Sequence, residues 1–371
     1  MEENLIKRDP GRIAWVDVLK FLGIFAIYLG HFGNMAGQLY LFVFSYHVPL
    51  FFFASGFFFR PPNYKTFLPY VAKKFCSLIV PYYVFTLFEI VVNFIRYNYA
   101  SGLIRLQLHE LLWGRRNHVG STWFLTGIFT VIILSAILTV IFRNRYLVLS
   151  ITFLLHVFYP KILSAFHIEP LSLFWNLDSA INYLVYFQLG FCLFPLLKKL
   201  EWKRKVICLG NATFLLCAIV SAFIAAVVYF KGEKFLLFSN FLRIPGLLQT
   251  LLLILFNCIC AKLLIGVPYL QDIGANTLIL CGCEFSSKAI LASLLALIGI
   301  VPKYSSPLTT VFYTAICLVF CYGIFVRFIR QYAPALSGRL TPKQIFEVCK
   351  SLIVDWRKGI KSDSEEVIKP E

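Results

Sequence analysis

The sequence predicts an all-α integral membrane protein, a polytopic bundle of about ten transmembrane helices with both termini in the cytoplasm. Hydrophobic residues make up 59% of the 371 residues and charged residues only 14%, whereas soluble domains are about half apolar and about a quarter charged. The apolar residues also gather in runs of about 20, the length that crosses a hydrocarbon core of about 30 Å. Lipid is therefore expected to cover most of the surface.

These apolar runs follow one another along the chain. They are Ile13–Phe32, Leu39–Phe59, Phe75–Ile95, Thr122–Phe142, the shorter Tyr146–Tyr159, Ser179–Leu197, Val206–Phe230, Ile244–Ile265, Ile273–Ile300 and Pro307–Phe328. The first run is too long for a cleavable signal peptide and contains Asp17 and Lys20, so we expect it to remain as a helix. The chain is thus divided into a cytoplasmic N-terminus (1–12), a membrane domain (13–328) and a cytoplasmic tail (329–371).

The distribution of Lys and Arg predicts the orientation, because cytoplasmic loops of membrane proteins carry an excess of both. With the N-terminus in the cytoplasm, most of the 35 basic residues fall into cytoplasmic segments, and an even number of spans returns the C-terminus to that side. The net charge of +17 then follows from topology and from attraction to anionic lipid, so nucleic acid is not an expected partner. The cysteines lie mostly in or beside spans, and no metal site is expected.

The tail contains a second helical pattern. The stretch Thr341-Pro342-Lys343-Gln344 has the form of a helix N-cap, a Pro at the first helical position and a capping-box Gln. Apolar residues then recur at helical spacing with Lys and Arg between them, at Ile345, Cys349, Leu352, Ile353, Trp356 and Ile360. This pattern predicts an amphipathic helix that lies on the cytoplasmic face of the membrane and anchors the tail.

The first span holds three ionisable residues, in a segment where each one is costly. At about 100° per residue, Lys20 and His31 lie within about 20° of the same helix face and Asp17 about 40° from His31, so all three should face one cavity or one neighbouring helix. Along the axis, Lys20 is about 16 Å and Asp17 about 21 Å from His31, which prevents Asp17 from orienting His31. Asp17 is expected to pair with Lys20, either as a self-satisfied pair or as a site for an anion from the cytoplasm.

The second span runs back inward after a short linker and carries His47 about one to three turns below the outer surface. Because the two helices are neighbours, His31 and His47 can flank one cavity in the outer half of the bundle. Pro49 is expected to clash with the carbonyl of Ser45 and to free it, which makes a polar pocket plausible there. The alternative is that His47 is a buried His satisfied by a neighbouring carbonyl.

Further charges lie in later segments. Glu284 and Lys288 have the i,i+4 order that favours mutual pairing, for which a structural role is as well supported as a functional one. Glu89 in the third span has no obvious local partner. The outer loop at about residues 96–121 either reaches a polar acceptor or lies at the membrane interface, and its polar residues are Arg105, His109, Glu110, Arg115, Arg116 and His118.

Four motifs occur in order along these spans. They are an aromatic-Asp-x-x-Lys-x10-His pattern (Trp15, Asp17, Lys20, His31), HVPLFFFASGF from His47 to Phe57, a basic segment leading into Val80-Pro81-Tyr82-Tyr83, and Trp123-Phe124-Leu125. Together they resemble acyltransferase family 3, the integral membrane O-acyltransferases, and within it the fucose 4-O-acetylase-like group. The resemblance extends over essentially all of the predicted spans.

The resemblance implies an O-acetyltransferase, that is, an acyltransferase that moves groups other than aminoacyl groups. The expected location is the bacterial plasma membrane, as a multi-pass protein. The enzyme would move an acetyl or other short acyl group from cytoplasmic acyl-coenzyme A to a sugar hydroxyl of a surface glycan or of a lipid-linked precursor. Acetyl-coenzyme A is then a co-substrate and no bound cofactor is expected, and the partners are the lipid bilayer, the acyl-coenzyme A and the glycan.

The resemblance also implies site residues. His31 is expected to be essential and Lys20 to be its companion, and Asp17 and His47 complete the candidate catalytic set. Lys73 and Lys74 stand in the basic segment that carries Arg-x-x-Arg in relatives and is associated with the acyl donor, although Ser77 departs from that pattern. Candidate pocket or acceptor residues are Trp123, Asn276 and Glu284. The stretch 273–284 departs from the family where many relatives have a His, so no chemistry is assigned to it.

The positions of these residues suggest a mechanism. Lysines at the inner side bind the phosphates of coenzyme A, its thioester arm extends up the bundle, and His31 acts as general base or carries the acyl group transiently. His47 either orients His31 or holds the acceptor. A multi-span glycan exporter without acyl transfer would share the aromatic-rich spans and the intramembrane charges, but the ordered motifs and the lack of a visible repeat favour the enzyme. A membrane sensor without chemistry is a third alternative.

Overall fold

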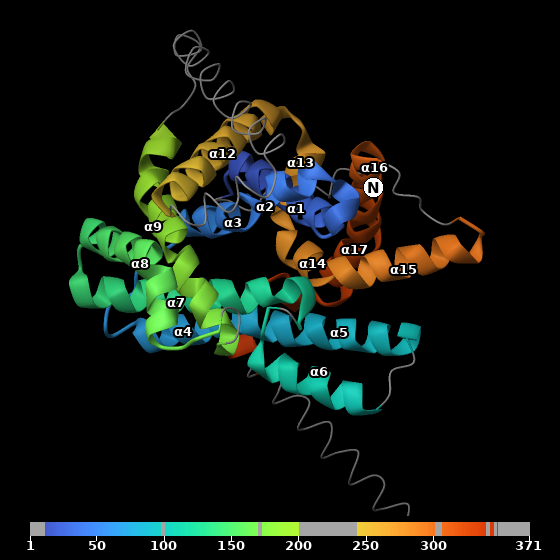
Figure 1. Cartoon of the computed structure of the whole chain (residues 1–371), viewed down its shortest axis with the longest axis horizontal. Coiled ribbons are helices and arrows are strands. Elements are labelled where there is room, and N and C mark those ends of the chain that lie inside the picture. The colour runs from blue at the N-terminus through green and yellow to red at the C-terminus, as the bar shows by residue number, and fades with distance from the viewer. Residues whose placement is uncertain are drawn as a thin grey trace, which may run out of the picture.

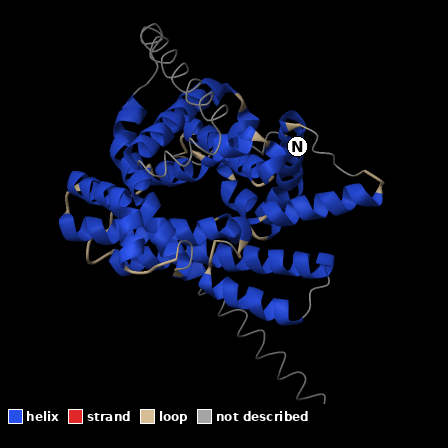
Figure 2. Cartoon of the chain, viewed as in Figure 1, coloured by secondary structure: helices blue, strands red, loops and turns tan. Residues whose placement is uncertain are grey.

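The computed structural model describes residues 12–97, 101–116, 118–169, 173–199, 243–300, 306–338, 342–344 and 347. In these ranges all regular structure is helical and no strand occurs (Figure 2), which confirms the predicted all-α class. The α-helices are α1 (Ala14–Gly30), α2 (Gln38–Phe44), α3 (His47–Gly56), α4 (Phe67–Lys74), α5 (Val80–Tyr97), α6 (Ser101–Trp113), α7 (Trp123–Phe142), α8 (Arg145–Ala165), α9 (Leu177–Lys199), α12 (Arg243–Leu263), α13 (Pro268–Ala275), α14 (Thr277–Gly282), α15 (Glu284–Leu297), α16 (Pro307–Cys321) and α17 (Arg327–Tyr332).

Seven helical segments of the described chain are long and apolar enough to cross a membrane. They are Gln38–Gly56, Phe67–Arg96, Gly120–Phe142, Arg145–Ala165, Phe174–Lys198, Gly246–Gly266 and Pro307–Tyr332. Each of them coincides with one of the apolar runs of the sequence. Several apolar helices of this length are characteristic of a multi-pass membrane protein.

The predicted count of about ten spans is not confirmed. The first predicted span forms α1, which is only 17 residues long. The ninth, Ile273–Ile300, is divided into α13, α14 and α15, of 8, 6 and 14 residues. The predicted span Val206–Phe230 and most of the predicted tail helix lie outside the described residues. The orientation with both termini in the cytoplasm stays a prediction.

The second predicted span is interrupted between α2 and α3, at Ser45 and Tyr46. Pro49 explains the break, because in a continuous helix its ring would clash with the carbonyl of Ser45, whereas the first turn of α3 needs no N–H at that position. The freed carbonyl of Ser45 accepts a hydrogen bond of 2.9 Å from the hydroxyl of Thr250 in α12. The predicted effect of Pro49 is thus confirmed, and the carbonyl joins α12 to the turn that precedes His47.

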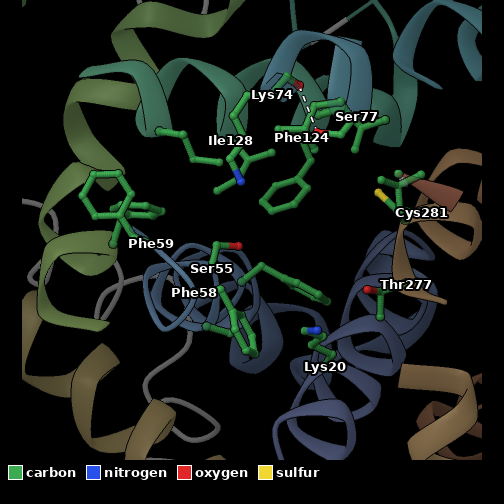
Figure 3. Close-up of a pocket in the computed structure, with 18 of the residues that line it drawn as sticks. Lys20, Ser55, Phe58, Phe59, Lys74, Ser77, Phe124, Ile128, Thr277 and Cys281 are labelled. Atoms are coloured by element: carbon green, nitrogen blue, oxygen red, sulfur yellow. Dashed lines mark hydrogen bonds between the residues drawn. The ribbon is translucent and has the colours of Figure 1, made fainter. Parts of the chain in front are cut away.

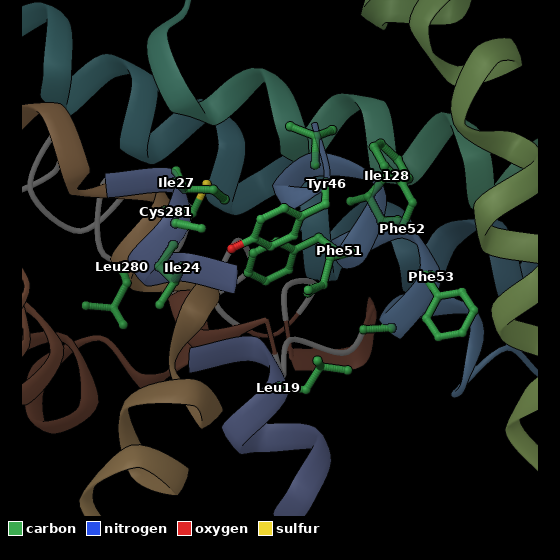
Figure 4. Packing of buried hydrophobic residues seen from close by; sticks show 14 of the residues in the cluster. Leu19, Ile24, Ile27, Tyr46, Phe51, Phe52, Phe53, Ile128, Leu280 and Cys281 are labelled. Atoms are coloured by element: carbon green, nitrogen blue, oxygen red, sulfur yellow. The ribbon is translucent and has the colours of Figure 1, made fainter. Parts of the chain in front are cut away.

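Helix α1 lies at the centre of the described bundle, in contact with α2, α3, α12, α13, α14 and α16 (Figure 1). A helix that is apolar almost all round is typical of such a surrounded position. Its fully buried residues are Val16, Val18, Leu19, Ile24 and Tyr28. Figure 4 shows residues of α1 in one cluster with aromatic residues of α3, which fixes α1 against the helix that carries His47.

Helices α3 and α9 approach each other at two glycines. A Cβ atom on Gly56 would lie 2.1 Å from the carbonyl oxygen of Phe187, and one on Gly190 would lie 2.0 Å from the carbonyl oxygen of Phe53. Small residues let helix backbones come together in this way in membranes, where close packing takes the place of the hydrophobic effect as the driving force. The position of α3, and therefore of His47, depends on this contact.

We expect Gly190→Ala to lower the stability of the folded protein by roughly 1–3 kcal/mol, because the new methyl group overlaps backbone that cannot rotate away. The measurement is the midpoint of thermal unfolding in detergent. Gly323→Ala is the matched control, since a Cβ atom there meets nothing within 4 Å. Equal midpoints for the two variants would contradict the close approach of α3 and α9.

Candidate active site

His31 lies at the end of α1 and contacts a carboxylate from a distant part of the chain. Its Nδ1 is 2.9 Å from each carboxylate oxygen of Glu284, 253 residues further on. The His31 ring also stacks on Phe285, with 5.1 Å between the ring centroids. The side chain of Glu284 is fully buried and that of His31 is 20% exposed. The carboxylate therefore lies behind the imidazole, which has the more open position.

Glu284 is also paired within its own helix. It is the first residue of α15, where the helix dipole favours a negative charge. One turn later, Nζ of Lys288 donates to Oε1 of Glu284 at 2.7 Å and to the carbonyl of Tyr28 at 2.9 Å. The predicted pair of Glu284 and Lys288 is confirmed. It provides a direct partner for a charge that would be very costly to bury alone.

The breaks around α14 bring Glu284 to the end of α1. Helix α14 is only 6 residues long, so its last carbonyls have no helical N–H to bind. Other parts of the bundle supply the missing donors: the hydroxyl of Tyr28 donates to the carbonyl of Leu280 at 2.8 Å, and that of Ser121 donates to the carbonyl of Cys281 at 2.6 Å. These bonds fasten α14 to α1 and to the start of α7, and so place the first turn of α15 beside His31.

The hydrogen bonds fix the tautomer of both imidazoles. A carboxylate only accepts, so in the neutral ring of His31 the Nδ1 carries the proton and donates it to Glu284. Nε2 of His31 then keeps its lone pair, as a general base requires. In His47 the Nδ1 donates to the carbonyl of Val43 at 2.7 Å, and the two described imidazoles do not bond to each other. The residue that orients His31 is Glu284, and His47 is a buried His satisfied by a backbone carbonyl.

His31 and His47 line one cavity of about 290 Å³, which we call the histidine cavity. Its polar lining also includes Arg116 and Ser121. Trp123, a predicted pocket residue, lies in its wall. The rest of the lining is Ile27, Phe44, Val48, Gly120, Phe124, Cys281 and Phe285.

A second and larger cavity, of about 430 Å³, is lined by Lys20 and Lys74, and we call it the lysine cavity. Lys20 of α1 and Lys74 of α4 approach it from opposite sides (Figure 3). Hydroxyl groups complete the polar lining, from Ser55, Tyr70, Ser77, Thr277 and Ser337. Two cations and several hydroxyls around one hollow suit an anionic ligand such as a phosphate ester.

The two cavities share part of their walls. Ile27, Phe124 and Cys281 line both of them, and these residues come from α1, α7 and α14. The shared side chains are apolar, and no charged residue belongs to both linings. The cavities are therefore neighbours, separated by the thickness of a few side chains.

Four predicted site residues lie outside both cavities: Glu284, which holds His31 from behind, and also Asp17, Lys73 and Asn276. Asp17 pairs with Lys20 at 3.4 Å, as predicted, but only Lys20 reaches a cavity, so Asp17, Lys20 and His31 do not face one cavity. Lys73 is exposed, because it lies about 100° from Lys74 around α4 and only one of them can face inward. The amide of Asn276 donates to the carbonyl of Asp272 at 2.7 Å. Within the described ranges, no three His, Cys, Asp or Glu side chains are grouped to hold a metal ion.

The arginine that lines the histidine cavity was not distinguished by the sequence from the other polar residues of its loop. Arg116 belongs to the segment of about residues 96–121, which the sequence predicts to be an outer loop that either reaches an acceptor or lies at the membrane interface. Its guanidinium lies over the ring of Trp123, 4.4 Å from the centroid, and borders the histidine cavity. No periodicity in the loop sequence distinguishes Arg116 from its neighbour Arg115.

Comparison with known proteins gives one match. The family model described as an acyltransferase domain matches residues 13–326, which is most of the chain. No curated protein and no solved structure matches the chain. The matched range contains both cavities except for the contribution of Ser337 and Gly338 to the lysine cavity.

Lys288→Met is expected to destabilise the fold by about 3–5 kcal/mol, because it removes one partner of a buried carboxylate. Adding Glu284→Gln removes the carboxylate charge, so Lys288→Met should cost less in that background, with a coupling energy of about 1 kcal/mol or more. Unfolding of the wild type, both single variants and the double variant in detergent measures this coupling. Additive losses would show that the pair does not interact.

Proposed function

The chain belongs to the acyltransferase family that it matches over residues 13–326, and on this premise we propose that it is a membrane O-acyltransferase. The proposed reaction moves an acetyl or other short acyl group from cytoplasmic acyl-coenzyme A to a sugar hydroxyl of a surface glycan or of a lipid-linked precursor. The proposed location is the plasma membrane of a bacterium, with both termini in the cytoplasm and the tail helix on the inner face.

One observation carries the proposal. Nδ1 of His31 is held by the buried carboxylate of Glu284, so that Nε2 is the nitrogen left for the histidine cavity. A carboxylate behind an imidazole is the arrangement that hydroxyl-activating enzymes use, because it fixes the tautomer and stabilises the imidazolium that forms during the reaction. Transporters also use buried His and carboxylate groups, so it is the family match together with this pair that favours the enzyme. We therefore assign catalysis to His31, and Glu284 is the residue that positions it.

The lysine cavity supports a donor site. Lys20 and Lys74 supply positive charge for the phosphates of coenzyme A, and Lys74 takes this role in place of the exposed Lys73. A cavity of about 430 Å³ suits the thioester arm rather than the whole acyl-coenzyme A molecule, whose nucleotide would remain at the inner mouth. Since Ile27, Phe124 and Cys281 also border the histidine cavity, an arm in the lysine cavity would end close to His31.

The proposed chemistry is a single displacement. The sugar hydroxyl gives its proton to Nε2 of His31 while its oxygen attacks the thioester carbonyl carbon. The C–S bond then breaks, and coenzyme A leaves as the thiol with the proton that His31 returns. Glu284 stabilises the protonated ring between these steps. In the alternative sequence, Nε2 of His31 attacks the thioester carbonyl carbon, the C–S bond breaks and coenzyme A leaves as the thiolate. The sugar oxygen then attacks the acyl-imidazole, the C–N bond breaks, and the hydroxyl proton goes to the thiolate.

His31→Ala should abolish acyl transfer while the protein remains folded, because the variant lacks the group that accepts the hydroxyl proton. Membranes receive isotope-labelled acetyl-coenzyme A, and the label on glycan is counted. His167→Ala, at an exposed site outside both cavities, is the control and should retain the activity. A fully active His31→Ala protein would remove His31 from the catalytic role.

Glu284→Gln is expected to lower transfer by about 10²- to 10⁴-fold, because the neutral amide no longer stabilises the imidazolium or enforces the tautomer. The loss should appear in kcat more than in KM for acetyl-coenzyme A, since Glu284 borders neither donor nor acceptor. A change confined to KM would assign Glu284 to substrate binding. The same labelling assay separates the transporter alternative, which predicts glycan movement without label on the glycan.

A further inference from the structure

The charge of Arg116 is not explained by the proposed reaction. Among the residues that line the histidine cavity, Arg116 is the one with a permanent positive charge, and none is acidic. The nearby charges of Glu284 and Lys288 are already paired with each other and with His31. The proposed transfer needs a base and a thioester, but it does not need a guanidinium on the acceptor side.

The guanidinium is held without an acidic partner. It lies over the ring of Trp123, 4.4 Å from the centroid, and within the described part of the chain it makes no ion pair. A guanidinium stacked on an aromatic face keeps its N–H donors at the edge, where they can form two parallel bonds to a carboxylate or phosphate. Arg116 therefore has the geometry of an anion receptor.

The adjacent arginine is arranged differently. Arg115 donates from Nε to Oε2 of Glu110 at 2.7 Å and also pairs with the other carboxylate oxygen. This hydrogen bond from Arg115 lowers the pKa of Glu110 below its ordinary value, so that Glu110 is charged at neutral pH. The acid of this loop is thus committed to Arg115, which does not line the histidine cavity. Of these two neighbouring arginines, only Arg115 pairs with a carboxylate in the described part of the chain.

The backbone that carries Arg116 is fixed by a buried side chain. Asn176 accepts a hydrogen bond from the backbone N–H of Arg116 at 3.0 Å and donates to the carbonyl of Gly114 at 2.6 Å. Asn176 has a φ of 55°, a conformation that Asn tolerates better than most residues. The fully buried Asn176 therefore holds the backbone of Arg116 in one position, so that the guanidinium is carried by a fixed turn.

We propose that Arg116 binds an anionic group, a carboxylate or a phosphate, carried by the acceptor sugar or by the unit directly linked to it. The enzyme is then selective for acidic glycans, and Arg116 sets the register in which one hydroxyl reaches His31. The inference rests on the proposed function and adds the chemical class of the acceptor. The lysines of the other cavity bind the donor, so donor and acceptor are recognised through separate cations.

The test is to find which sugar receives the acyl group. Membranes that contain the full-length protein and their own glycans receive isotope-labelled acetyl-coenzyme A, and tandem mass spectrometry locates the label within the glycan. We expect the labelled sugar, or the unit directly linked to it, to carry a carboxylate or a phosphate, and the fragment masses distinguish the two. A labelled neutral sugar with only neutral neighbours would overturn the inference while leaving the acyltransferase intact.

Variants test whether Arg116 is the residue responsible. Arg116→Gln should lower labelling about ten- to a hundred-fold, because a charged hydrogen bond to the acceptor is lost. Arg116→Lys should lose less, since it keeps the charge but not the two-bond geometry. Arg105→Gln removes the same charge from an exposed position of α6, outside both cavities, and should label like the wild type. Equal losses from Arg105→Gln and Arg116→Gln would overturn the assignment, and a wild type that labels no glycan would contradict the proposed function itself.

Discussion

The arrangement of the candidate site depends on one buried carboxylate. The side chain of Glu284 has no exposed surface, and a charge in that position is tolerated only with direct partners. Its partners are Lys288, one turn further along α15, and His31 at the end of α1. The same charge therefore joins the first described helix to one near the end of the chain, fixes the tautomer of an imidazole, and keeps Lys288 against the carbonyl of Tyr28.

Interruptions in the helices are what allow this contact. Non-helical backbone is tolerated at membrane depth only where other parts of the protein satisfy its polar groups. Hydroxyls perform that task here, from Thr250 at the break after α2 and from Tyr28 and Ser121 at the end of α14. Each of these bonds also joins helices that are distant in sequence. The breaks and the hydroxyls together determine where His31, His47 and Glu284 lie.

Sequence patterns predicted what lies within one helix better than what lies between helices. The helical class, the Glu284 and Lys288 pair and the effect of Pro49 all follow from composition or from local spacing. The contact between His31 and Glu284 does not, because helical geometry gives the face of a residue but not the helix that will cover it. The choice between Lys73 and Lys74 also requires the neighbours of α4. Arg116 lies in a loop without periodicity, where no pattern separates it from Arg115.

The wall that the two cavities share has a further consequence. Ile27, Phe124 and Cys281 present no charge and little polarity, so an ion passing between the cavities would have to lose its hydration there, which is strongly unfavourable at membrane depth. In the proposed topology the acyl donor enters from the inner side, and a surface glycan would be reached from the outer side. An uncharged acyl group can pass such an apolar wall at far lower cost than a hydrated salt ion. Acyl transfer across this wall would therefore not require a leak of salt ions.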